Sequence, residues 1–161
     1  MLMDRLHSYW RMPYVKLPQG QKEGDPFLEI PKAADPKSVH LVWKGAHSYI
    51  VMNKFPYNCG HLLAIPLRKV ADIEDLEGEE KAEFFDSIIL AKRILKKALN
   101  PDAFNIGFNL GAKAGAGIPE HLHCHIVPRW DGDTNFMPVI SDTKVLPESM
   151  DALWERLVKC V

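Results

Sequence analysis

Cysteine is scarce in this chain, and long hydrophobic runs are missing. The three cysteines, Cys59, Cys124 and Cys160, lie far apart and form no Cys-x-x-Cys pair, which argues against a disulfide framework and against a zinc ribbon. No apolar run approaches the ~20 residues that cross a bilayer, and the charged first residues lack the apolar core of a secretory signal. We therefore expect a cytoplasmic protein with reduced thiols and no membrane partner.

An excess of charge of one sign is also missing. The chain has 20 Lys and Arg residues against 21 Asp and Glu residues, a net charge of −1. It therefore lacks the basic field that attracts nucleic acid or a membrane surface. Its 161 residues, 47% of them hydrophobic, are enough for one domain with its own core. Any recognition of phosphate must be arranged locally.

Frequent prolines set residues 1–38 apart as an N-terminal arm, and residues 39–161 are expected to form the main domain. Within the arm, residues 25–31 predict an edge strand or a segment that packs on a partner subunit. Long regular elements are disfavoured there by prolines, which stand at Pro13, Pro18, Pro26, Pro31 and Pro36.

The pattern after residue 38 predicts an α+β domain. Apolar residues recur at three- and four-residue steps over residues 78–99, which predicts one long amphipathic helix. A second, C-terminal helix is expected to begin near Pro147. Strands grouped apart from helices favour α+β over a doubly wound sheet. Short runs rich in β-branched and aromatic residues predict strands over residues 39–44, 49–52, 61–65, 104–110 and 121–127.

Three histidines alternate in the run His121-Leu-His-Cys-His125. Alternate residues of a strand share a face, so His121, His123 and His125 are expected on one face, with Cys124 turned into the core. A buried imidazole needs partners for its ring nitrogens. Three of them on one face therefore indicate a functional site.

Two kinds of site remain open from the residues alone. His121 and His123, with a remote histidine, could ligate zinc. Alternatively, one imidazole could be a nucleophile or general base whose neighbours fix its tautomer. The glycine-rich loop of residues 111–117 precedes the triad and contains Lys113. Its backbone N–H groups could bind phosphate, which favours the second interpretation.

Three blocks of the sequence resemble the histidine triad family of nucleotide hydrolases and transferases. His121-Leu-His-Cys-His-Ile-Val127 is similar to the family signature, in which three histidines alternate with apolar residues. Asn53-Lys-Phe-Pro-Tyr-Asn-Cys-Gly-His-Leu-Leu-Ala-Ile-Pro66 resembles its Asn…Pro…Gly-His segment. Asn109-Leu-Gly-Ala-Lys-Ala-Gly115 is similar to its Asn-x-Gly-x-x-Ala-Gly loop. Together the blocks form a specific match.

The resemblance implies a fold and a set of catalytic residues. The family fold is an antiparallel sheet of about five strands with a long helix, here followed by a C-terminal helix, and its members form homodimers or larger assemblies. His123 would attack the α-phosphorus and form a covalent nucleotidyl-histidine without a metal. His121 and His125 would orient and polarise that imidazole or contact the phosphate. His61, at the fourth-histidine position of the family, would complete the cluster.

The resemblance also implies nucleotide-binding residues. Asn53 would contact the ribose or base end of the nucleotide. Asn109 and the glycine-rich loop would contact the phosphates, the loop positions being Gly111, Lys113, Gly115 and Gly117.

Within the family, the chain looks most like the bacterial diadenosine tetraphosphate phosphorylases. Gly117 stands where the fragile histidine triad hydrolases carry Gln, and the N-terminal run Trp10-Arg-Met-Pro-Tyr14 fits the phosphorylase branch. The implied reaction is nucleotidyl transfer from a dinucleoside polyphosphate through His123, resolved by inorganic phosphate as co-substrate, with no cofactor. The alternatives are a hydrolase of the same substrates or of adenosine phosphoramidates, a zinc-dependent hydrolase, and a non-catalytic nucleotide-binding module.

Overall fold

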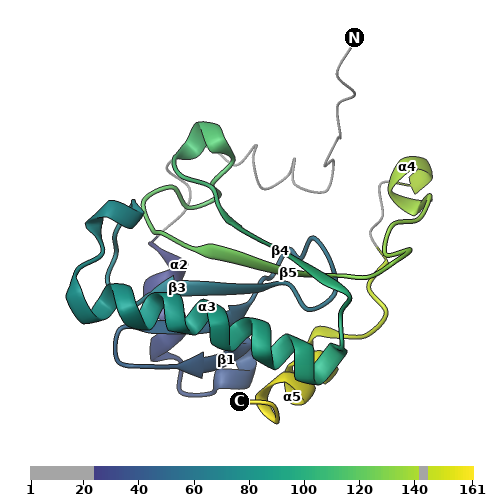
Figure 1. Cartoon of the computed structure of the whole chain (residues 1–161), viewed down its shortest axis with the longest axis horizontal. Coiled ribbons are helices and arrows are strands. Elements are labelled where there is room, and N and C mark those ends of the chain that lie inside the picture. The colour runs from purple at the N-terminus through teal and green to yellow at the C-terminus, as the bar shows by residue number, and fades with distance from the viewer. Residues whose placement is uncertain (1–23, 142–144) are drawn as a thin grey trace.

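A five-stranded antiparallel sheet in the order β1-β2-β3-β5-β4 is the centre of the fold (Figure 1). The computed structural model describes residues 24–141 and 145–161. The expected α+β class is confirmed, and each strand lies within three residues of its predicted bounds. The strands are β1 Leu41–Lys44, β2 Ser48–Met52, β3 Leu62–Pro66, β4 Ala103–Phe108 and β5 Cys124–Arg129.

The long helix α3 spans Gly78–Leu99, as the periodicity predicts. It ends at Asn100, which adopts a left-handed conformation before Pro101. The C-terminal helix α5, Met150–Val158, begins after the cap Ser149 rather than near Pro147. In the described residues, no helix is long and apolar enough to cross a membrane. The shorter helices are α2 Pro26–Glu29, η2 Ile30–Lys32, η3 Pro36–Val39, η4 Ile73–Asp75, η5 Ala112–Ala114 and α4 Met137–Ser141.

Alternation along the strands divides the apolar side chains between two faces of the sheet. One face packs against α3 and α5 and forms the larger core. The opposite face carries a smaller cluster beneath α2 (Figure 1). Cys124 and Ile126 of β5 belong to the larger core, so His125 between them points to the face beneath α2. The members of the smaller cluster are Phe27, Leu41, Tyr49, Val51, Leu63 and Ile65.

Residues 25–31 do not form the expected edge strand but the short helix α2 and the start of η2. The side chain of Asp25 accepts a hydrogen bond from the Phe27 N–H at 3.0 Å, and Pro26 occupies the first turn of α2, where a proline loses no hydrogen bond. The buried Tyr49 hydroxyl donates to the Phe27 carbonyl at 2.8 Å. This part of the arm is therefore integral to the domain, while residues 1–23 of the arm lie outside the described residues.

The packing of the core predicts how two substitutions change the free energy of unfolding. Phe84 of α3 is fully buried, whereas Phe136 is 68% exposed. We expect Phe84→Ala to lower the free energy of unfolding by about 3–5 kcal/mol because it leaves a cavity. The matched Phe136→Ala should change it by less than about 0.5 kcal/mol. Urea unfolding followed by circular dichroism measures both, and equal losses would contradict this description of the core.

Candidate active site

The histidine triad is divided between a strand and the segment that precedes it. Strand β5 begins at Cys124, so the expected strand over residues 121–127 is wrong for its first three residues. Strand β5 pairs with β3 only as far as Cys124, opposite Ala64, although β3 itself continues to Pro66. Ahead of β5, the chain instead hydrogen-bonds elsewhere, with the Leu122 N–H donating to the carbonyl of Val70.

His61 and His125 form one hydrogen-bonded chain whose direction is fixed by the backbone. The Tyr57 N–H donates to His61 Nδ1 at 3.0 Å, so this nitrogen is an acceptor and the proton of the neutral ring lies on Nε2. His61 Nε2 lies 3.0 Å from His125 Nδ1 and donates to it. The remaining proton of a neutral His125 is therefore on Nε2, which makes this nitrogen a donor.

His123 has the opposite tautomer. Its Nδ1 lies 2.8 Å from the carbonyl oxygen of His121. A carbonyl only accepts, so Nδ1 carries the proton and Nε2 of the neutral ring carries the lone pair. The rings of His123 and His125 are 5.1 Å apart and nearly perpendicular. A potential nucleophile and a hydrogen-bond donor therefore lie side by side.

His121 lies on the same face of the chain as the other two members of the triad, because the ring of Phe27 contacts both His121 and His123, whereas Leu122 and Cys124 belong to the larger core. Its side chain is fully buried, with Nδ1 2.8 Å from Asp25 Oδ2 and Nε2 2.8 Å from the carbonyl oxygen of Pro66. The cavity described next is lined by His123 and His125 but not by His121. The expected alternation of histidines and core residues therefore holds, but His121 does not reach the cavity.

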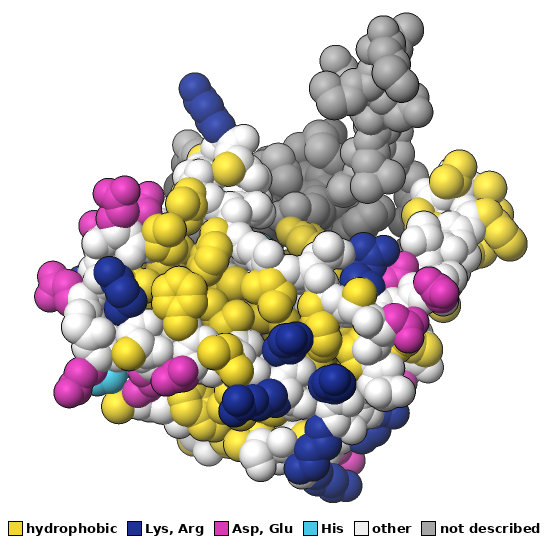
Figure 2. Space-filling model, in the orientation of Figure 1, with side chains coloured by type: hydrophobic (Ala, Val, Ile, Leu, Met, Phe, Trp, Pro, Cys, Tyr) yellow, Lys and Arg dark blue, Asp and Glu magenta, His cyan; other side chains and the backbone are white. Residues whose placement is uncertain are grey.

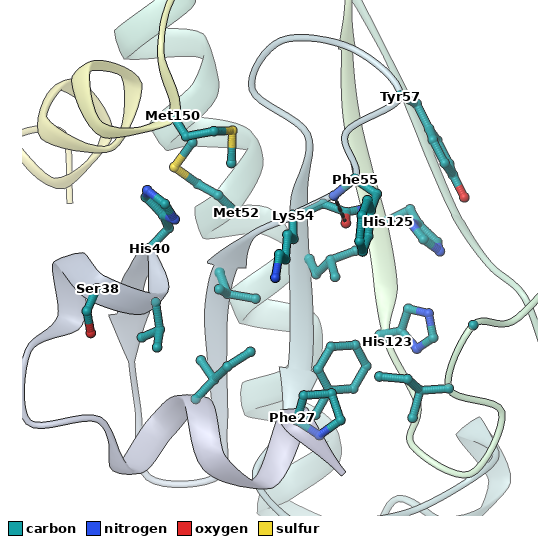
Figure 3. A pocket seen from close by; sticks show the side chains of 18 residues that line it. Phe27, Ser38, His40, Met52, Lys54, Phe55, Tyr57, His123, His125 and Met150 are labelled. Atoms are coloured by element: carbon teal, nitrogen blue, oxygen red, sulfur yellow. Dashed lines mark hydrogen bonds between the residues drawn. The ribbon is translucent and has the colours of Figure 1, made fainter. Parts of the chain in front are cut away.

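A cavity of about 590 Å³ lies against the face beneath α2, with His123 and His125 at one end (Figure 3). Met52, Met150 and His40 lie towards the other end (Figure 3). Its volume is within the range of small-molecule sites, and its mainly apolar wall with few polar groups is typical of them. The other lining residues are Pro26, Phe27, Ile30, Ser38, Val39, Val51, Asn53, Lys54, Phe55, Tyr57, Leu63, Gly117 and Ile118.

The predicted binding residues fall into two groups. Asn53 and Gly117 line the cavity, and Asn53 also lies 3.3 Å from His61 Nδ1. The other predicted positions belong to the loop between β4 and the triad, which forms the short helix η5, and do not line the cavity. Asn109 faces Gly115, where an added Cβ would lie 3.9 Å from its side-chain nitrogen. The positions outside the lining are Asn109, Gly111, Lys113 and Gly115.

Two neighbouring groups take no part in the arrangement. Burial raises the pKa of the Cys124 thiol to about 12, which removes it as a nucleophile near neutral pH. Arg129 forms hydrogen bonds with Asp133 at 2.6 and 2.9 Å and holds the pKa of that carboxyl well below its usual range.

The zinc interpretation loses one of its ligands. It required a lone pair from His121, but both ring nitrogens of His121 face acceptor oxygens. Across residues 24–141 and 145–161, no group of three or more His, Cys, Asp or Glu side chains could hold a metal ion.

Sequence reasoning missed two residues that contact the triad. Asp25 is 96 positions from His121, and the only local signal was an aspartate before Pro26, typical of a helix cap. Tyr57 stacks on His125 with ring centroids 5.4 Å apart and donates its N–H to His61. Tyr57 lies within the block that resembles the family, but the resemblance implies no role for it.

Imidazoles of fixed tautomer beside an apolar cavity define a domain suited to nucleophilic and acid–base chemistry by histidine. The model of the HIT domain family matches residues 36–132. AP-4-A phosphorylase of Mycobacterium tuberculosis is 39% identical over 153 residues, which cover 91% of this chain and 78% of that protein. The chain therefore belongs to the histidine triad (HIT) family, which confirms the resemblance.

Two further relatives are more distant. Bis(5'-adenosyl)-triphosphatase of Saccharomyces cerevisiae is 35% identical over 91 residues, 56% of this chain and 44% of that protein. A hypothetical histidine triad nucleotide-binding protein of Sulfolobus tokodaii has the same fold, with a TM-score of 0.68 at 22% identity, over 84% of this chain and 91% of that one. Both relatives named for an activity are HIT-family enzymes.

Proposed function

We propose that this enzyme cleaves dinucleoside polyphosphates such as diadenosine tetraphosphate and transfers the nucleotidyl group to inorganic phosphate. The observation that carries the proposal is the pair of opposite tautomers. His123 presents an Nε2 lone pair, fixed by its bond to the His121 carbonyl, and His125 presents an Nε2 proton, fixed by its bond from His61. The 39% identity to an AP-4-A phosphorylase supports the substrate class and the acceptor.

In the first step, His123 Nε2 attacks the α-phosphorus while the bond to the bridging oxygen breaks. The Nε2–H of His125 donates a hydrogen bond to that oxygen and stabilises the charge that develops on it, and the nucleoside polyphosphate leaves as the anion. The nucleotidylated ring of His123 becomes positively charged, and its Nδ1–H continues to donate to the carbonyl of His121, which stabilises that charge. One difficult displacement is thereby divided into two easier ones.

In the second step, an oxygen of inorganic phosphate attacks the same phosphorus and His123 leaves as a neutral imidazole. The proton of the attacking phosphate passes to solvent, and both histidines are again neutral with their original tautomers. With diadenosine tetraphosphate, the products are ATP from the first step and ADP from the second.

The cavity supports binding of a nucleoside in this reaction. Its apolar wall suits the faces of a base, and Asn53 supplies a polar group beside the histidines. Gly117 places backbone, without a side chain, near His123 and His125. We infer that the α-phosphate lies there, with the rest of the glycine-rich loop closer to the remaining phosphates.

Product analysis tests the proposal. The enzyme is incubated with diadenosine tetraphosphate with and without inorganic phosphate, and the products are separated by anion exchange. Phosphate-dependent formation of ADP and ATP supports the phosphorylase. Formation of AMP and ATP regardless of phosphate indicates the hydrolase, which the 35% identity to a bis(5'-adenosyl)-triphosphatase favours as second candidate. Nucleotide binding without turnover of this substrate or of adenosine phosphoramidate would leave a binding module.

His123→Ala should lower the rate on the order of 10⁴-fold or more, whereas the control His47→Ala, at a half-exposed histidine, should not.

The proton on His125 predicts a dependence on the leaving group. His125→Ala should slow cleavage of diadenosine tetraphosphate by about 10²- to 10³-fold, because the hydrogen bond to the leaving oxygen is lost. Cleavage of the p-nitrophenyl ester of AMP should slow far less, because p-nitrophenolate spreads its charge over the ring and needs less stabilisation. His61→Ala should show the same trend with smaller losses. Equal losses on both substrates would show that His125 does not stabilise the leaving oxygen.

We also propose that the enzyme is a homodimer formed through α3 and β4. Strand β4 is an edge of the sheet, and an edge strand can pair with its own copy about a twofold axis. Hydrophobic side chains gather on this face (Figure 2). The large, exposed ones are Phe85, Ile89, Ile106 and Leu110.

The dimer is tested by its mass. Light scattering should give twice the chain mass of 18.3 kDa for the wild type. Ile106→Lys should give the mass of one chain, because a charge would be buried at the interface. The control Ile140→Lys, at a residue that is 68% exposed in α4, should remain dimeric. A wild type that is monomeric would overturn the proposal.

A further inference from the structure

A buried aspartate outside the triad contacts its first histidine. Asp25 Oδ2 lies 2.8 Å from His121 Nδ1, and the two side chains are 6% and 0% exposed. The second ring nitrogen of His121 faces the carbonyl oxygen of Pro66 at 2.8 Å. The carbonyl of Pro66 only accepts, so His121 Nε2 carries a proton, and the contact between Nδ1 and Asp25 holds the other side of the ring.

This pair lies directly behind the proposed nucleophile. Held on both sides, the ring of His121 cannot turn, and the carbonyl of the same residue accepts the Nδ1–H of His123 at 2.8 Å. The ring of Phe27, two residues after Asp25, contacts both imidazoles, with centroids 5.5 Å from His121 and 5.2 Å from His123. The segment of residues 25–27 therefore supports the triad from behind.

We propose that Asp25 is a positioning residue that keeps His123 in its Nδ1–H tautomer by fixing the ring and carbonyl of His121. The inference rests on the proposed function in one respect, the role of His123 as nucleophile. Without the carboxylate, the ring of His121 loses a partner, its backbone gains freedom, and His123 gains access to the tautomer with its proton on Nε2. That tautomer has no lone pair to attack phosphorus.

Asp25 has a second contact that the test must separate from the first. Its other carboxylate oxygen, Oδ1, accepts the Phe27 N–H at 3.0 Å and caps α2. Asp35 provides a matched control, because it also precedes a proline and accepts the Lys37 N–H at 3.0 Å. Within the described residues, the hydrogen bonds of Asp35 join it to Lys37 and Ser38 and not to a histidine ring.

The variants are Asp25→Ser, Asp25→Asn and Asp35→Ser. Serine and asparagine both remain good helix caps, but serine is too short to reach His121. We expect Asp25→Ser to lower kcat by about 10²- to 10⁴-fold with KM little changed, by analogy with a catalytic histidine held in the wrong tautomer. Asp25→Asn, which keeps the volume but removes the charge, should lose less, and Asp35→Ser should keep the wild-type kcat.

Nitrogen-15 spectra of the histidine rings provide a readout that needs no substrate. In the wild type, His121 should carry a proton on Nε2 and His123 on Nδ1. In Asp25→Ser, His123 should show a mixture of tautomers, whereas in Asp35→Ser it should not. If Asp25→Ser fails to fold, the same comparison is made with Asp25→Asn, which should show a smaller share of the second tautomer.

Two outcomes would overturn the inference. The first is an unchanged His123 ring in both Asp25 variants. The second is an equal loss of kcat in Asp25→Ser and Asp35→Ser, which would reduce Asp25 to a helix cap. If the enzyme fails to transfer nucleotides at all, the spectra still decide whether Asp25 holds the tautomer, so the two failures are distinguishable.

Discussion

The hydrogen bond from His123 Nδ1 to the carbonyl of His121 is the interaction on which the site depends. A neutral imidazole has one donor and one acceptor nitrogen, so fixing the proton on one side places the lone pair on the other. Two other parts of the structure serve this bond. The pairing of β3 with β5 ends at Ala64 and Cys124, which lets residues 121–123 leave the ladder, and the buried contact with Asp25 keeps the ring of His121 in place.

The sheet brings the second pair of imidazoles together. His61 directly precedes β3 and His125 lies in β5, 64 residues apart in the sequence. The antiparallel register between Leu63 and His125 puts both rings on the same side of the paired strands. The apolar residues of the opposite face pack against α3, so a one-residue slip would bury His125 in that core. The register that stabilises the core therefore also places the hydrogen-bond donor.

Local patterns in the sequence predict much of this structure. The period of helix α3 and the three blocks that resemble the HIT family were sufficient for the fold and for the histidine cluster. That His121 does not reach the cavity could not be foreseen, because the alternation of residues 121–125 is the same whether or not the strand pairing continues. Asp25 could not be assigned either, since a helix cap and a partner of a buried histidine look alike in sequence.

The charges around the cavity favour catalysis over tight binding. Of the described lysines and arginines, Lys54 alone lines it. Arg129 pairs with Asp133, Lys69 pairs with Glu120 at 2.7 Å, and the Asp25–His121 pair has no net charge in either protonation arrangement. Among the described residues, a polyanionic substrate would thus meet mostly neutral donors, including the Nε2–H of His125. Interactions of this kind hold the ground state weakly, so more of the binding energy is reserved for the charge that develops on the leaving oxygen.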